Sequence, residues 1–271
     1  MTAAVLFAAL GLAWFSFRYA WWRPAADAAW PRVLMYHMIS APRAGARFNG
    51  LRVAPERFER QLCWLREQGW HSVTVSELVE LGERLPERCF AITFDDGYAD
   101  NLLQALPLLQ RYRCKATLYL VVDRFERDWS VLRKAHHDEG ELRREPKLSD
   151  AQVETLLASG CVELGSHSLT HANFLQLDNE AARRELVDSR QALEARFGVT
   201  VKSFAWPFGL YRDEQVALAE QAGYTSAVTT HEGIESPRCW RPLQLRRIKI
   251  SGKDNWLDFR LRLRGGRRGW R

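Results

Sequence analysis

Eight short apolar runs, separated by amphipathic stretches, recur along this chain of 271 residues. This alternation is typical of strands and helices taking turns, and eight such units predict a parallel (β/α) barrel or a distorted form of one. Pro55 and the Ser149-Asp150 pair mark the starts of two helices, and a long charged helix is expected over 179–197. The predicted strands cover residues 33–36, 72–75, 90–94, 116–122, 162–165, 203–206, 226–229 and 247–250.

The excess of positive charge lies at one end of the chain. Lys and Arg number 39 against 33 Asp and Glu, a net charge of +6, and residues 260–271 hold six arginines and no acidic residue. The rest of the chain is therefore neutral, which excludes the broad basic face expected of a nucleic-acid-binding protein. Interleaved with Leu261, Leu263 and Trp270, these arginines predict contact with anionic lipid headgroups; the alternative is a solvated basic end.

The opposite end is apolar. Residues 2–17 carry no charge, and Arg18, Trp21, Trp22 and Arg23 follow. Extended by the aromatic residues, the segment approaches the roughly 20 residues of a spanning helix, and it is expected to be an uncleaved anchor with the tryptophans at the interface. A cleaved signal segment is the alternative.

The basic residues after this segment favour a catalytic body on the cytoplasmic face of the inner membrane, with the periplasmic face as the alternative. Five scattered cysteines without a CxxC pair agree with a reducing compartment. We expect residues 1–23 to be an anchor or signal segment, 31–252 a single catalytic domain, and 253–271 a basic tail. Within the domain, the highly charged residues 124–147, which include His136 and His137, predict an insertion or lid over a rim.

Two adjacent carboxylates, Asp95 and Asp96, end the apolar run at 90–94. In a parallel barrel the chemistry gathers at the carboxyl ends of the strands. Two neighbouring carboxylates repel each other unless one binds a cation while the other accepts a proton, so the pair predicts a metal ligand beside a general base. Asp-Asp-Gly is also common in turns, which is the structural alternative.

Two histidines, His167 and His171, follow the run at 162–164 with a spacing that lets both imidazoles meet one ion. Alone this spacing is weak evidence. Together with Asp96 it predicts a His, His, Asp set with open positions for water and substrate, as in catalytic zinc and related sites. At this chain length a core needs no structural metal, so we expect any metal to be catalytic.

Two further strand ends carry residues of interest. Trp206, Pro207, Phe208 and Gly209 turn the chain after the run at 203–206, and their aromatic rings could stack on a sugar while a backbone N–H meets an oxyanion. Ordinary packing explains them equally well. His37 ends the first strand, where a lone histidine is as consistent with a core residue as with a catalytic one.

The order YH, TFDDG, HSLTH and FAWPFG, over roughly residues 31–250, resembles the polysaccharide deacetylase (NodB homology) family, carbohydrate esterase family 4. The resemblance implies a distorted (β/α) barrel and metal-dependent removal of N-acetyl groups from an amino sugar. It implies Asp95 as general base, with Asp96, His167 and His171 as ligands of a divalent metal, zinc or in its place cobalt or nickel. Residues 204–209 would form the wall of the acyl and sugar groove.

The sequence departs from the family pattern at two points. The Leu-x-x-His segment that supplies a general acid in many relatives is absent, which leaves His231 and His37 as candidates. Larger branches also carry an arginine in the third motif that pairs with the base, whereas Ser203 and Phe204 stand here. How Asp95 is oriented is therefore open.

We expect an N-deacetylase acting on an N-acetylhexosamine of a lipid-linked or lipopolysaccharide-type envelope glycan. The partners would be that N-acetylated glycan and a membrane surface, without nucleic acid. One alternative is a periplasmic deacetylase of a polymer such as poly-N-acetylglucosamine, chitin or peptidoglycan. Another is a non-catalytic carbohydrate-binding relative, which the intact base and ligand set disfavours.

Overall fold

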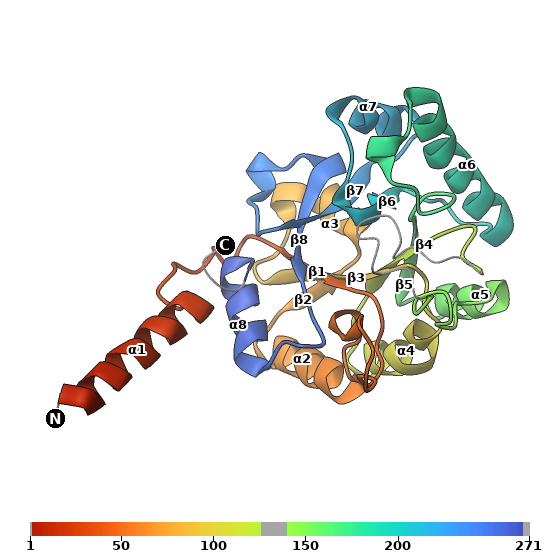
Figure 1. Ribbon diagram of the computed structural model, residues 1–271. Coiled ribbons are helices and arrows are strands. Elements are labelled where there is room, and N and C mark those ends of the chain that lie inside the picture. Colours follow the sequence, from red (N-terminus) through yellow and green to blue (C-terminus); the bar gives the residue numbers. More distant parts are fainter. Residues whose placement is uncertain (1, 126–139, 268–271) are drawn as a thin grey trace.

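Parallel strands close into a barrel in the computed structural model, which describes residues 2–125 and 140–267 (Figure 1). The strands are β1 (Arg32–Tyr36), β2 (His71–Val73), β3 (Cys89–Asp95), β4 (Ala116–Leu120), β5 (Val162–Ser166), β6 (Ser203–Ala205), β7 (Ser226–Glu232) and β8 (Leu245–Lys249). Neighbours in the sheet follow the order β1-β8-β7-β6-β5-β4-β3, and β3 pairs back onto β1. The prediction of a distorted parallel (β/α) barrel is confirmed.

The distortion lies at β2. This short strand pairs only with residues 89–91 of β3, while β4 pairs with residues 92–95 of the same strand. Seven strands of the described chain therefore form the ring and β2 sits at its edge. The predicted strand at 72–75 ends early because Thr74 caps the next helix, accepting a hydrogen bond from the Glu77 N–H. Every residue of β3 is buried, since helices cover the outside of the ring and side chains fill its interior.

Helices alternate with the strands around the ring, as Figure 1 shows. They are α1 (Thr2–Tyr19), α2 (Pro55–Glu67), α3 (Val75–Leu81), α4 (Leu106–Arg111), α5 (Asp150–Ala158), α6 (Asn179–Phe197), α7 (Asp213–Gln221) and α8 (Trp256–Gly265). Pro55 is the first residue of α2, and the Ser149 side chain caps α5 at the Gln152 N–H. The three helix starts predicted from the sequence are confirmed.

The predicted insertion at 124–147 is described only at its two ends. Residues 126–139, with His136 and His137, lie outside the described residues. At the near end the guanidinium of Arg124 is buried, where it donates to the Leu148 carbonyl at 2.6 Å and pairs with Asp150 at 2.5 Å. The two ends of the segment are thereby tied to each other and to the start of α5.

Most of the predicted basic tail is the packed helix α8. Phe259 and Leu263 are buried against the barrel. Arg262 is buried as well, and its guanidinium pairs with Asp254 at 2.8 Å and with Glu232 at 2.5 Å. The interpretation of 260–271 as a lipid-facing segment is therefore corrected for Arg262 and Leu263, because helical periodicity turns both toward the core. Trp270 lies outside the described residues.

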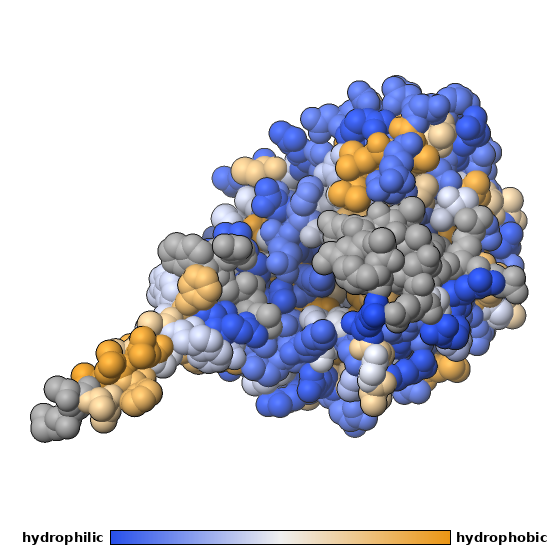
Figure 2. All heavy atoms as spheres, viewed as in Figure 1, coloured by the Kyte–Doolittle hydropathy of each residue, from blue (hydrophilic) through white to orange (hydrophobic). Residues whose placement is uncertain are grey.

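Helix α1 projects from the barrel, and its apolar side chains are exposed (Figures 1 and 2). Phe7 is 74% exposed and Trp14 63%. At the base of the helix, Arg18 pairs with Asp258 of α8 at 3.4 Å. Among residues 2–125 and 140–267, no helix combines the length and hydropathy needed to cross a membrane.

The linker after α1 runs across the amino ends of the strands. The Ala28 carbonyl accepts a hydrogen bond from the N–H of Arg88, the residue before β3, at 2.8 Å. The Ala26 N–H donates to the Arg264 carbonyl at 2.8 Å. Arg32, the first residue of β1, donates to the Leu263 carbonyl at 2.9 Å. Helix α1 is thus joined to the barrel at the edge where the strands begin.

Candidate active site

The two adjacent carboxylates lie at the carboxyl end of β3. Asp95 is the last residue of the strand and Asp96 the first of the turn, and both are buried. Asp96 has a φ of 76°, in the left-handed region that non-glycine residues rarely adopt. Gly97 follows with a φ of 75°, and a Cβ there would lie 2.4 Å from the Leu120 side chain. This strained turn directs the two successive carboxylates to different partners, and strain of this kind is common at functional sites.

Asp96, His167 and His171 form a buried group that could hold a metal ion, here called the ligand triad. The Nε2 atoms of His167 and His171 lie 3.4 and 3.5 Å from Asp96 Oδ1. Tetrahedral zinc with Zn–N and Zn–O bonds near 2.1 Å would place its ligand atoms roughly 3.4 Å apart. The described residues therefore fit a divalent metal in donor type, burial and spacing.

A backbone carbonyl orients one of these imidazoles. His167 follows β5, and its Nδ1 lies 2.7 Å from the carbonyl oxygen of Ala205 at the end of β6. This contact orients the ring with Nε2 directed at Asp96, and a hydrogen on Nδ1 allows Nε2 to bind a metal once Nε2 has lost its own proton. His171, like Asp96, has a left-handed φ, at 58°. Two of the three ligand-triad residues are thus held in a costly backbone conformation.

Burial and mutual contact shift the pKa values of the ligand triad. Burial would raise the pKa of Asp96, but the hydrogen bond from His167 and the charge of His171 outweigh it and lower that pKa well below its usual range. Burial, with the neighbouring His167, lowers the pKa of His171 to about 3. Near neutral pH Asp96 is accordingly a carboxylate and His171 a neutral imidazole, the forms that bind metals. Although burial opposes it, contact with Asp96 and Asp95 raises the pKa of His167, so a metal ion would displace a proton from that imidazole.

Arg247 holds the second carboxylate. It lies on β8, fully buried, and its two terminal nitrogens each donate to one oxygen of Asp95 at 2.7 Å. Burial would raise the pKa of Asp95, but the charge and hydrogen bonds of Arg247 lower it. No sequence pattern indicated this residue. Arg247 and Lys249 alternate with Ile248 and Ile250 in the strand predicted at 247–250, and the alternation does not tell which of the two cations is buried.

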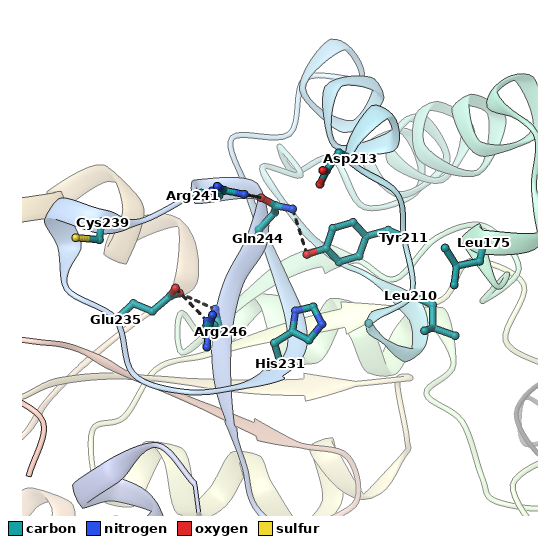
Figure 3. A pocket seen from close by; sticks show the side chains of 11 residues that line it. Leu175, Leu210, Tyr211, Asp213, His231, Glu235, Cys239, Arg241, Gln244 and Arg246 are labelled. Atoms are coloured by element: carbon teal, nitrogen blue, oxygen red, sulfur yellow. Dashed lines mark hydrogen bonds and ion pairs between the residues drawn. The ribbon is translucent and has the colours of Figure 1, made fainter. Parts of the chain in front are cut away.

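The two candidate general acids lie in different surroundings. His37, next after β1, is close enough to Asp95 and Asp96 for their charges to affect it, although burial dominates and lowers its pKa. His231 is exposed, and its ring lies 6.3 Å from that of Tyr211 in a neighbouring pocket (Figure 3). The structure therefore places His37 beside the carboxylate pair and His231 in a separate pocket.

The aromatic turn after β6 is partly buried. Trp206 is fully buried among Phe174, Phe204 and Tyr211, so the predicted direct contact of its ring with a substrate is corrected. Its indole N–H donates to a backbone carbonyl at 2.9 Å, which anchors the turn. Pro207 is buried as well.

Phe208 is the residue of this turn that reaches the ligand triad. Its ring centroid lies 4.5 Å from that of His171, edge to face. Phe208 and Gly209 both have left-handed φ values, 58° and 66°. A Cβ on Gly209 would lie 2.1 Å from the Thr230 hydroxyl, so glycine is required where the turn passes over β7.

Together the fold and the site define a barrel hydrolase with a candidate metal centre beside a second buried carboxylate. The chain belongs to the polysaccharide deacetylase family, whose model matches residues 82–227. Members of this family hydrolyse amide bonds in glycans. The motifs at Asp95 and Asp96 and at His167 and His171 fall inside the matched range.

Similar proteins cover most of this chain. YxkH of Bacillus subtilis, whose name places it among the polysaccharide deacetylases, is 29% identical over 86% of this chain and 75% of its own length. The poly-β-1,6-N-acetyl-D-glucosamine N-deacetylase of Escherichia coli is 24% identical over 77% of this chain, which spans only 36% of that enzyme. The crystal structure of BC0361, a polysaccharide deacetylase from Bacillus cereus, has a TM-score of 0.71 at 26% identity and covers 87% of this chain and 69% of its own.

Proposed function

We propose that this protein removes N-acetyl groups from a polymer of N-acetylglucosamine, with release of acetate. The observation that carries the proposal is the position of Asp95, fixed by Arg247 and directly preceding Asp96 of the ligand triad. Several similar proteins are named poly-β-1,6-N-acetyl-D-glucosamine N-deacetylases. Their names favour the polymer, the alternative in the sequence analysis, over a lipid-linked glycan.

A divalent ion bound by the ligand triad, which we propose to be zinc, would supply polarisation of the amide carbonyl and a water of lowered pKa. Cobalt or nickel could take its place. Asp95 accepts the proton of the attacking water, and Arg247 keeps its carboxylate ionised and oriented. Since a buried base with a depressed pKa is ionised at neutral pH, Asp95 is ready to accept that proton.

The remaining steps need an anion-stabilising donor and an acid. We propose as donor the backbone N–H of Phe208, whose ring contacts His171; it would bond the carbonyl oxygen as that oxygen becomes negative. Because burial lowers its pKa, His37 starts neutral and takes up the proton that Asp95 removed from water. His37 then donates that proton to the sugar nitrogen as the carbon–nitrogen bond breaks, giving acetic acid, which ionises to acetate, and a free amine.

Acetate release from β-1,6-linked N-acetylglucosamine oligosaccharides tests the proposal. We expect the wild-type protein to release acetate and Asp95→Asn to release none above background, with Arg183→Ala, an exposed residue of α6, as the matched control. Chitin oligosaccharides and peptidoglycan fragments, assayed in parallel, identify the linkage. Absence of acetate from every N-acetylated glycan in a metal-loaded sample would refute the proposal and favour a non-catalytic carbohydrate-binding role.

We further propose that α1 associates the protein with a membrane. The exposed apolar side chains of α1 and the pair Trp21 and Trp22 at its end, 46% and 44% exposed, support this. The arginines that follow the segment favour a catalytic domain on the cytoplasmic side. Removal of residues 1–23 should release the protein from the membrane fraction, and a reporter fused after Arg271 that is active only in the periplasm would contradict the cytoplasmic side.

A further inference from the structure

A pocket lined by Leu210 and Tyr211 lies next to the aromatic turn at 206–209 (Figure 3). Its volume is about 640 Å³, within the range of pockets that hold small ligands. Gly209 lines it, while the preceding Phe208 contacts His171 of the triad. The same turn therefore contacts both the ligand triad and this pocket. We call it the Tyr211 pocket.

One side of the Tyr211 pocket is an aromatic ring held at a fixed angle. Tyr211 stacks on the buried Trp206, with ring centroids 4.6 Å apart and planes 26° from parallel. Trp206 is itself fixed by its indole hydrogen bond to the Leu243 carbonyl. Because Trp206 covers one face of the Tyr211 ring, the part that lines the pocket is the side turned away from it. A rigid, half-buried aromatic face of this kind suits the apolar face of a sugar ring.

Planar polar groups surround this ring. Gln244 Nε2 donates to the Tyr211 hydroxyl at 3.3 Å, and Arg241 donates to Gln244 Oε1 at 3.4 Å. Asp213 lies above them in Figure 3, at the start of α7. Amide, guanidinium and carboxylate groups in one place offer both donors and acceptors to hydroxyl and acetamido groups.

The charges of the pocket are balanced. Arg246 pairs with Glu235 at 3.2 Å on the far wall, and Asp213 offsets Arg241. A pocket for a phosphate or another anion would carry an excess of positive charge, which these four side chains do not. The balance instead favours a neutral, hydroxyl-rich ligand.

We propose that the Tyr211 pocket binds a second hexosamine ring of the glycan while a neighbouring N-acetyl group occupies the ligand triad. This inference rests on the proposed function and deepens it, since it makes the protein selective for chains over single sugars. The ring would lie on Tyr211, with its hydroxyl groups bonded to Gln244, Arg241 and Asp213. Longer chains would then be preferred because a second ring contacts the Tyr211 pocket, away from the N-acetyl group that reacts.

Alkylation of the exposed Cys239 thiol measures occupancy of the Tyr211 pocket without requiring catalysis. Cys239 lines the pocket, whereas Cys63 lies on α2, away from it. We would measure alkylation of both thiols by iodoacetamide in Asp95→Asn, which cannot consume the ligand. A tetrasaccharide of β-1,6-linked N-acetylglucosamine should slow alkylation of Cys239 at least about fivefold and leave Cys63 unchanged. The monosaccharide should protect neither thiol.

The outcomes separate the two proposals. Binding of the tetrasaccharide, seen by calorimetry, without protection of Cys239 would overturn the second-ring inference and leave the proposed function standing. Equal protection by the monosaccharide would also overturn it. Failure of the tetrasaccharide to bind, together with no acetate release by the wild type, would overturn both.

Kinetics of pocket variants give an independent test. We expect Tyr211→Leu and Arg241→Ala to lower the ratio of kcat/KM for a hexasaccharide to that for a disaccharide by about threefold to tenfold. Arg241 is exposed, so its replacement should not affect folding even if that of Tyr211 does. Arg238→Ala, next to Cys239 but paired with Glu83 outside the pocket, is the matched control. Ratios equal to that of the wild type in both pocket variants would refute the inference.

Discussion

The guanidinium of Arg247 donates to both carboxylate oxygens of Asp95, each at 2.7 Å, across 152 residues of sequence. Arg247 also donates to the Thr93 hydroxyl at 2.9 Å and to the Thr229 carbonyl at 2.7 Å. With its hydrogen-bonding nitrogens engaged, the side chain has little freedom to move. The barrel thus supplies from β8 the cation that larger branches of the family carry in their third motif.

This pairing predicts the effect of Arg247→Lys. Lysine keeps the positive charge but cannot bond both oxygens at once, so Asp95 loses its fixed orientation. We expect kcat to fall about 10- to 100-fold with bound metal unchanged, which kinetics and elemental analysis would measure. Arg247→Ala should lower the free energy of unfolding by about 3–5 kcal/mol, because it leaves a buried carboxylate unpaired. A kcat for Arg247→Lys equal to wild type would contradict the orienting role.

Metal content should separate the ligand triad from the base. His167→Ala removes one of three ligands and should lose the metal on dialysis, whereas Asp95→Asn should keep about one ion per chain and lose activity. Elemental analysis of the dialysed proteins, with acetate release measured on the same samples, checks both. If both variants keep full activity, the assignment of the site is wrong.

His37 should differ from a histidine remote from the site in its effect on departure of the leaving group. His37→Gln should lower amide hydrolysis about 10²- to 10⁴-fold, because the amine needs a proton to depart. Hydrolysis of an acetate ester with a phenolate leaving group should fall far less, because phenolate departs without being protonated. His71→Gln, at an exposed histidine of β2, serves as the control. Equal losses on both substrates for His37→Gln would indicate a structural role.

Asp100, a partly buried carboxyl four residues after Asp96, predicts a pH dependence of stability. Burial raises the pKa of Asp100 from its ordinary 3.8 to about 6, although a hydrogen bond from the Ile39 backbone opposes the shift. A carboxyl with a raised pKa in the folded state contributes stability at low pH, and that contribution is lost as the pH rises from about 4 to 6.

Asp100→Asn removes the free-energy cost of ionising this carboxyl in the folded protein. At pH 7 we expect the variant to exceed the wild type in free energy of unfolding by up to about 3 kcal/mol, with the difference shrinking toward pH 4. Urea unfolding across this pH range measures it, and Asp188→Asn, an exposed carboxyl on α6, is the control. A difference that does not change with pH would disprove the effect of burial.

Two glycines with nearly the same backbone angle make a matched pair. Gly198, after α6, has a φ of 65° and open space around its Cα, whereas a Cβ on Gly209 would meet Thr230. Gly198→Ala should cost about 1 kcal/mol, the price of the left-handed conformation alone. Gly209→Ala should cost more and also lower kcat/KM, since relieving the clash moves Phe208. Thermal unfolding and kinetics of both variants test this, and equal costs would refute the clash.

The sequence predicted the barrel and the ligand triad well because both depend on local signals. Apolar runs mark buried strands, and polar residues directly after them mark the carboxyl edge, where Asp96 and His167 lie. Arg247 could not be assigned in this way, because its partner is on another strand and an arginine in a strand gives no hint of which way it points.

Burial of Trp206 and of Arg262 also escaped the sequence. Trp206 is covered by Phe174 and Tyr211, which follow different strands, and no local pattern links them. Arg262 sits among closely spaced arginines, a composition typical of an exposed segment, yet Asp254 and Glu232 neutralise it inside the fold. In both cases one of the covering residues, Phe174 for Trp206 and Glu232 for Arg262, is about 30 positions away in the sequence.

The position at which α1 joins the barrel affects which substrates could reach the ligand triad if a membrane held α1. The helix meets the edge where the strands begin, and the ligand triad lies at the edge where they end, separated by a strand of five residues or roughly 17 Å. A bilayer that held α1 would therefore lie behind the catalytic face. The barrel would then open toward the aqueous phase, and a sugar on a carrier lipid of that same leaflet would have to bend around the domain to arrive. A long, free glycan would meet the opening directly.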